Sequence, residues 1–159
     1  MRNNRGFTLI ELMVTIAVLA IIVAMAVPFF GDMLSRQNLN KSAQELVSIM
    51  NEARAKAVLE RRVITVNLRT TNVADTNNQL NWKPTGNAVL RSGNPTVILF
   101  GITGGVFIPD PSNPPSVIPA TTDTSFMVCD TATGTNRKSK TITVSRMGTI
   151  QMIAEGACS

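Results

Sequence analysis

The feature that most constrains this chain is an apolar segment of 24 residues, 7–30, close to its N-terminus. Its only clearly polar positions are Thr8, Glu11 and Thr15. As a helix it would be about 36 Å long, enough to cross a hydrocarbon core of about 30 Å. The apolar core of a secretory signal is shorter, about 7–15 residues, and no small-x-small cleavage site follows here. The segment therefore predicts a retained membrane helix.

Glu11 is the unusual residue of this segment, because a carboxylate at membrane depth costs about 2.5–3.5 kcal/mol. One explanation is that Glu11 lies near enough to the interface to reach water or to be protonated. The other is that it pairs with a positive charge. Cleavage after Gly6 would create such a charge on the α-amino group of Phe7, and Glu11 would become the fifth residue of the mature chain.

The run Gly6-Phe7-Thr8-Leu9-Ile10-Glu11-Leu12, followed by an apolar helix, resembles the class III signal of type IV pilins and pseudopilins. The resemblance implies that a prepilin peptidase cleaves between Gly6 and Phe7 and methylates Phe7. It also implies that Glu11 neutralises the amino terminus of a neighbouring subunit during assembly. Pro28 matches a common proline of the family, and we expect a kink or a local melt of the helix there.

The distribution of basic residues mainly indicates how the chain is oriented in the membrane. The full chain carries a net charge of +5, and loss of Arg2 and Arg5 with the leader 1–6 would leave +3. These two arginines flank the apolar segment and predict a cytoplasmic N-terminus, although Arg36 and Lys41 on the other side weaken the asymmetry. The predicted localisation is single-pass in the inner membrane with a periplasmic domain, and then the filament at the cell surface.

Cys129 and Cys158 are the two cysteines of the chain. In an oxidising compartment such a pair usually closes, and a loop of this size would stabilise the fold by about 3–4 kcal/mol. Two free thiols are the alternative. The chain has no histidine and neither cysteine has a neighbour at ligand spacing, so we expect neither a metal nor a cofactor.

After Pro28 the sequence predicts that the helix resumes and ends near Arg61. Apolar residues at spacings of three and four form one stripe: Leu39, Ala43, Leu46, Val47, Met50, Ala53, Ala57 and Val58. Beyond the helix, β-branched and alternating segments predict strands at 62–68, 79–83, 96–100, 105–108, 125–129, 141–145 and 149–153.

Turn signals separate these strands. Gly148 is predicted to form a hairpin turn into the last strand. The segment 109–123 holds five of the eight prolines, which predicts an exposed, semi-extended loop and excludes a central strand. The fold class is therefore α+β, with a long N-terminal helix packed on a C-terminal antiparallel sheet domain. Its predicted parts are the leader 1–6, the membrane helix 7–30, the amphipathic half 31–61 and the β-rich domain 62–159.

The residues at the helix-to-strand junction resemble one particular group within this family. Ala43 and Leu46, then Ala53-Arg54 and Ala57 ahead of the strand from Arg62, are similar to the GspH/FimT group, which includes FimU. Ordinary helix packing with a solvated Arg54 also accounts for these residues, and the likeness is weak across 70–125. The resemblance implies a minor pilin that helps initiate a type IV pilus and sits at its tip. The alternative is a GspH-like pseudopilin of a type II secretion system. Implied partners are other pilins, prepilin peptidase and, before assembly, inner-membrane lipid.

A FimT-like DNA-uptake pilin is the second alternative. Its basic G-R-x-R element corresponds here to 148–151, which contains no arginine. Arg137, Lys138 and Lys140 form a predicted basic turn that could contact phosphates, but a solvated hairpin tip explains them equally. No aromatic residue is interleaved for base stacking, which argues against nucleic acid as a partner. The absence of histidine, tyrosine and a paired-carboxylate motif argues against an enzyme.

Overall fold

A computed structural model describes residues 7–68, 73–110, 112–113, 115–130 and 137–158, apart from the side chains of residues 27–29 and 152. The helix α1 runs from Leu9 to Glu60. The chain divides into two compact units, Met1–Leu34 and Ser35–Ser159, and α1 contributes to both. Each unit is described by itself.

The first unit consists of the apolar part of α1. Leu9–Ala26 has a mean hydropathy of 2.7 and is, by length and composition, able to cross a membrane. Its large apolar side chains are all exposed within this chain. The helical assignment continues through residue 28, so the structure does not contain the local melt that we allowed for there. A kink at Pro28 stays a prediction.

The second part of α1 forms one wall of the core, as the stripe predicts. Six of its members are at most 3% exposed: Leu39, Ala43, Leu46, Met50, Ala53 and Ala57. Val47 packs against this core from its margin. Val58 was assigned wrongly, because it is 46% exposed. Successive helical residues point about 100° apart, so Val58 cannot share the inward direction of Ala57.

The helix ends one residue before the predicted position. Arg61 adopts the left-handed conformation, with φ 51°, and the amide of Arg62 donates to the carbonyl oxygen of Ala57 at 3.3 Å. This pairing is the six-to-one hydrogen bond of a Schellman motif, here with arginine in the position that glycine usually occupies. The motif directs the chain into the first strand.

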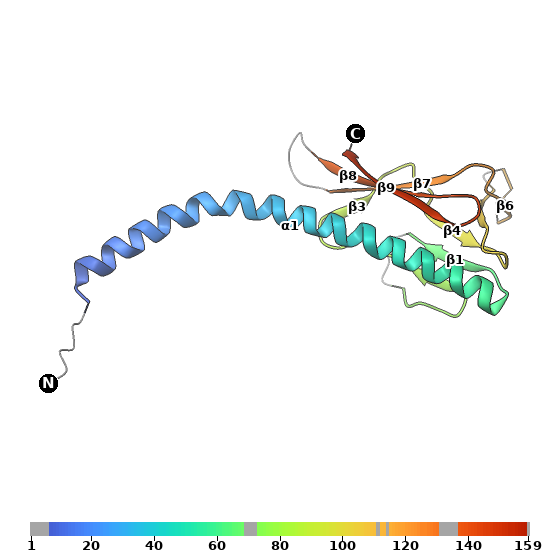
Figure 1. Ribbon diagram of the computed structural model, residues 1–159, viewed down its shortest axis with the longest axis horizontal. Coiled ribbons are helices and arrows are strands. Elements are labelled where there is room, and N and C mark those ends of the chain that lie inside the picture. Colours follow the sequence, from blue (N-terminus) through green and yellow to red (C-terminus); the bar gives the residue numbers. More distant parts are fainter. Residues whose placement is uncertain (1–6, 69–72, 111, 114, 131–136, 159) are drawn as a thin grey trace. The chain divides into compact units, whose positions relative to one another are not determined.

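Within the described residues, nine strands form two sheets. Figure 1 labels most of these strands beside α1. The first sheet has the order β2-β1-β4-β5-β6 and the second β3-β7-β8-β9. All pairings are antiparallel except β1 with β2. The strand bounds are β1 Ile64–Asn67, β2 Gln79–Asn81, β3 Ala88–Leu90, β4 Val97–Phe100, β5 Val106–Pro109, β6 Val117–Pro119, β7 Thr124–Asp130, β8 Lys138–Val144 and β9 Ile150–Ala157.

The second part of α1 runs alongside the strands of this unit in Figure 1, and one core joins the helix to both sheets. Trp82, Phe100 and Phe126 are its largest members and are 0–1% exposed. A helix stripe packed on sheets is the arrangement that the amphipathic pattern predicts. The predicted α+β fold is thus confirmed, with the strands divided between two sheets.

All seven predicted strands are present, with shifted ends, and β3 and β6 were missed. Strand β6 lies in the proline-rich segment, at the edge of the first sheet, and all three of its residues are exposed. The prediction of a loop is therefore wrong for Val117–Pro119, and the exclusion of a central strand fails at Pro109, which ends the interior strand β5. The predicted basic turn is wrong for Lys138 and Lys140, which belong to β8, a central strand paired with β7 and β9. Their backbones complete the ladder to β9, which extends to Ala157.

Candidate functional site

The first candidate site is the start of α1. Phe7 precedes the helix and is 84% exposed, and Glu11 lies in the first helical turn. Gly6, the predicted processing residue, lies outside the described residues. The apolar residues that follow Glu11 are exposed, so this end of the chain presents one carboxylate on a largely apolar surface.

Thr8 caps this helix, a role that our sequence analysis missed. Its Oγ1 accepts a hydrogen bond from the amide of Glu11 at 3.3 Å, and its carbonyl oxygen accepts one from the amide of Leu12 at 3.2 Å. Thr8 and Glu11 are three residues apart, which is the capping-box spacing, and that pattern is visible in the sequence. A carboxylate in the first turn also interacts favourably with the helix dipole. Glu11 therefore has a local role in addition to any contact with a partner.

The side chain of Glu11 is available to a partner. None of the ion pairs among the described residues includes it. The nearest basic residue on its C-terminal side in the sequence is Arg36, 25 residues further along the chain. A carboxylate without a partner in its own helix is expensive in lipid and is relieved by a cation from another chain or another terminus.

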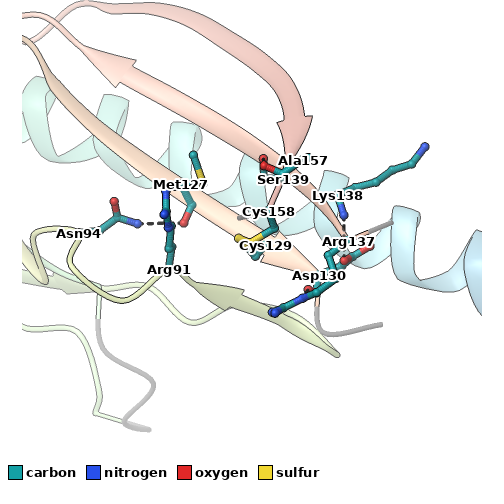
Figure 2. Close-up of a disulfide and its surroundings, with 10 residues drawn as sticks. All are labelled: Arg91, Asn94, Met127, Cys129, Asp130, Arg137, Lys138, Ser139, Ala157 and Cys158. Carbon is teal, nitrogen blue, oxygen red and sulfur yellow. Dashed lines mark hydrogen bonds between the residues drawn. A yellow bond between two sulfur atoms is a disulfide. The ribbon is translucent and has the colours of Figure 1, made fainter. Parts of the chain in front are cut away.

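The second candidate feature is the disulfide (Figure 2). It joins Cys129, buried in β7, to Cys158, which follows β9, with 5.8 Å between their Cα atoms. The amide of Cys158 donates to the carbonyl oxygen of Arg137 at 2.8 Å, which continues the β8–β9 ladder beyond Ala157. The predicted pairing of the two cysteines is present. The disulfide joins β7 to the residue that follows β9, and these two strands lie on opposite sides of β8. It therefore fixes the end of β9 to the second sheet.

The three predicted phosphate-binding cations have different surroundings. Arg137 donates from Nε to the carbonyl oxygen of Asp130 at 3.3 Å, and the backbone amide of Lys138 donates to Oδ1 of Asp130 at 3.1 Å. Figure 2 shows both residues beside Asp130. Lys140 Nζ lies 3.0 Å from Oε1 of Glu155. One of the three charges is thus neutralised by an ion pair, which weakens the case for a DNA-binding site.

Lys138 and Lys140 also line a cavity that the sequence did not reveal. Its volume is about 420 Å³, and it lies between α1, β8 and β9. From α1 it receives Arg36, Leu39 and Asn40. The pKa of Glu155 is lowered chiefly by the hydrogen bond and the charge of Lys140, and further by the charges of Lys138 and Arg36. Three cations therefore act on one carboxylate at this cavity, which we call the basic groove.

Arg54 is not simply solvated. Its Nε is buried without a hydrogen-bond partner among the described residues. A Cβ added at Gly104 or Gly148 would lie 3.1 Å from this Nε, and both glycines have positive φ, 80° and 79°. The arginine of the junction therefore packs against two turns, one before β5 and one before β9. The positive φ at both positions favours glycine, and the close approach of Arg54 leaves little room for a side chain there.

Comparison with known proteins adds to this geometry. Residues 1–27 match the family model described as the prokaryotic N-terminal methylation motif. The N-terminal region is type IV pilin-like. The match contains Gly6, Phe7 and Glu11 and ends just before Pro28.

Curated relatives agree with this assignment. A "Fimbrial protein" of Pseudomonas aeruginosa is 38% identical over 64 residues, 40% of this chain and 41% of that protein. "Fimbrial protein EcpB" of Eikenella corrodens is 42% identical over 48 residues, 30% of each chain. "Type II secretion system protein H" of P. aeruginosa is 36% identical over 62 residues, 39% of this chain and 36% of that protein. The chain thus spans about two fifths or less of these relatives. No solved structure matches it.

Proposed function

We propose that this protein is a minor pilin of a type IV pilus, similar to FimU, which helps initiate assembly and sits at or near the filament tip. The observation that carries the proposal is Glu11. It is a lone carboxylate in an exposed apolar helix, inside a methylation motif and without an ion-pair partner in the described chain. In this proposal the chain is cleaved between Gly6 and Phe7, Phe7 is methylated, and Glu11 pairs with the amino terminus of a neighbouring pilin.

The same geometry supports a sequence of states. The precursor is held in the inner membrane by α1, with its N-terminus cytoplasmic and residues 35–159 in the periplasm. The disulfide fits an oxidising compartment. Prepilin peptidase binds the precursor first, and other pilin subunits are the partners of the mature chain. During assembly the exposed apolar side chains of α1 move from the lipid into the filament.

The test separates the charge of Glu11 from its position in the capping box. Glu11→Gln keeps a side chain that suits the box, whereas Glu11→Leu removes both the box and the charge. We expect both variants to insert into the membrane and both to be depleted from sheared pili. Thr8→Ala weakens the cap and leaves the charge, so it is the matched control and is expected to be recovered near the wild-type level. Recovery of Glu11→Gln equal to wild type would refute a role for the charge in assembly.

Processing has its own test. Gly6→Ala adds a Cβ at the proposed cleavage point, and we expect an uncleaved precursor in the inner membrane. Mass analysis of the N-terminus decides the outcome. A mature chain of the variant that begins at Phe7 would contradict the assignment of Gly6.

A GspH-like pseudopilin of a type II secretion system is the second candidate, supported by the similarity to the P. aeruginosa protein H. Deletion of the gene distinguishes the two. Loss of surface pili with secretion unchanged supports the pilus, and the reverse supports the secretion filament. A DNA-uptake pilin ranks third, because 148–151 lacks arginine and Lys140 is paired with Glu155.

A further inference from the structure

The basic groove is built entirely from the second unit. Its charged residues come from three elements that are distant in sequence: Arg36 from α1, Lys138 and Lys140 from β8, and Glu155 from β9. The β8–β9 ladder places Lys140 directly opposite Glu155, and Lys138 opposite Ala157. The groove is therefore a product of the fold rather than of a local run of basic residues.

The groove has an excess of positive charge. Glu155 pairs with Lys140, whereas no ion pair among the described residues includes Arg36 or Lys138. The side chain of Glu155 is 77% exposed and that of Lys140 only 17%, so the carboxylate lies at the mouth of the groove. A stronger acceptor, such as a phosphate, could replace it on Lys140 while also meeting Arg36 and Lys138.

The position of Arg36 along the chain selects the kind of phosphate. Arg36 is only the sixth residue after Phe30, where the apolar segment ends, a step of about 9 Å at helical rise. The headgroup layer of a bilayer adds about 5–7 Å to each side of the hydrocarbon core. When the apolar segment occupies the membrane, the short stretch of chain after Phe30 keeps Arg36 within reach of the headgroup layer.

The lining of the groove also disfavours a nucleic acid. The described residues that line it include no aromatic side chain on which a base could stack. A volume of about 420 Å³ suits one headgroup rather than a length of strand. We propose that the basic groove binds the phosphodiester headgroup of an anionic phospholipid, such as phosphatidylglycerol, while the subunit waits in the membrane. The proposal rests on the proposed function, because it needs the subunit to be membrane-anchored before assembly.

The experiment uses the isotope-labelled full chain in neutral detergent micelles. Phosphatidylglycerol is added stepwise, and the amide signals of Lys138 and Gly156 are followed by NMR. We expect a saturable shift of these signals that phosphatidylcholine does not produce. We expect the half-saturating amount of lipid to rise about fivefold in Arg36→Gln and in Lys138→Gln, the effect of one cation on binding to an anionic membrane surface.

Two further variants make the test specific. Arg146→Gln removes an exposed cation outside the groove and is expected to leave the half-saturating amount unchanged. Glu155→Gln removes the ion-pair partner of Lys140 and is expected to lower the half-saturating amount of lipid. Loss of structure could not produce such a gain in affinity. Each variant must keep the dispersed spectrum of the folded chain.

Three results would overturn the proposal: an equal response to phosphatidylcholine, an equal effect of Arg146→Gln and Arg36→Gln, or no gain in Glu155→Gln. Glycerol phosphate and a short single-stranded DNA oligonucleotide complete the design. Saturation by glycerol phosphate at the same concentration would assign the groove to free phosphate, and tighter binding of the oligonucleotide would assign it to nucleic acid; both refute the lipid. The Glu11 experiment is independent, so either proposal can fail alone.

Discussion

At the scale of single residues, Gly148 combines two requirements that no other residue type meets. Its φ of 79° lies in the left-handed region, and the turn places it against the carbonyl oxygen of Gly104 and the side chain of Arg54. The amide of Gly148 donates to Ser145, and the amide of Ser145 donates to Thr149, both at 2.8 Å, which closes the turn between β8 and β9. The sequence indicated this turn but not its contact with Gly104.

Substitution of Gly148 separates these requirements. Gly148→Ala is expected to lower the free energy of unfolding by more than about 2 kcal/mol, because backbone strain and a collision with Gly104 act together. Gly93→Ala is the matched control, since Gly93 has a φ of 87° but no atom within 4 Å of an added Cβ. Strain alone predicts a loss of about 1–2 kcal/mol there. Denaturant unfolding measures both, and equal losses would show that the contact with Gly104 has no cost.

At the scale of elements, β9 is an edge of its sheet, and β8 is its one partner among the described strands. Its far end is held by the disulfide and by the hydrogen bond from Cys158 to Arg137. Edge strands fray readily, because half of their backbone groups lack a partner in the sheet. The disulfide lies just beyond the last pair of the β8–β9 ladder and opposes that fraying.

Removal of the disulfide tests this role. Cys158→Ser is expected to lower the free energy of unfolding by about 3–4 kcal/mol, the chain-entropy value for a loop of this length. Cys129→Ser should cost at least as much, because its hydroxyl is placed in a buried position, 1% exposed. A thiol titration of the unfolded, unreduced wild type should give no free thiol. Two reactive thiols in the protein isolated from the periplasm would contradict the bridge.

The elements differ in how far the sequence could predict them. The helix was predicted to within one residue at its end, because its stripe has a long regular period and Arg61 interrupts it. Strands β2, β3 and β6 have three residues each, too short to show a clear alternation. Only β2 lay within a longer segment that was predicted as a strand, 79–83, whereas β6 is surrounded by prolines. Lys138 and Lys140 were placed in a turn because charge is typical of turns, whereas here pairing with β9 decides their conformation.

At the scale of the whole molecule, folding and anchoring use different residues. Every buried apolar residue among those described lies at or beyond Leu39. The unit Ser35–Ser159 therefore contains its own core, the disulfide and the basic groove. The sequence predicted the core and the pairing of the cysteines, but the groove depends on three distant segments meeting and could not be predicted without the fold.

A truncated chain of residues 35–159 is expected to fold cooperatively in solution. In that fragment Leu46→Ala should cost about 2–5 kcal/mol, because Leu46 is fully buried. Leu59→Ala is the matched control; Leu59 is 81% exposed and its loss should be nearly neutral. Thermal unfolding followed by circular dichroism compares the three proteins. A fragment without a cooperative transition would show that residues before 35 are needed for folding.

The same fragment tests DNA binding. Residues 148–151, which correspond to the G-R-x-R element, contain no arginine. Lys140 forms an ion pair with Glu155. We expect no affinity for DNA tighter than the non-specific range of about 10⁻⁴–10⁻⁶ M at physiological salt. A gel-shift titration measures it. Submicromolar binding that disappears when Arg137, Lys138 and Lys140 are replaced by alanine would move the DNA-uptake function to first place.

A core that begins at Leu39 has a consequence for how such a chain can evolve. Substitutions in residues 7–34 do not alter the core of the second unit, so selection on them depends on what the apolar helix contacts outside its own chain. Substitutions beyond Leu39 are constrained first by whether the second unit still folds. The two halves of the gene can therefore change at different rates and under different partners. A domain of new surface chemistry could be joined to the same first 34 residues without redesign of either part.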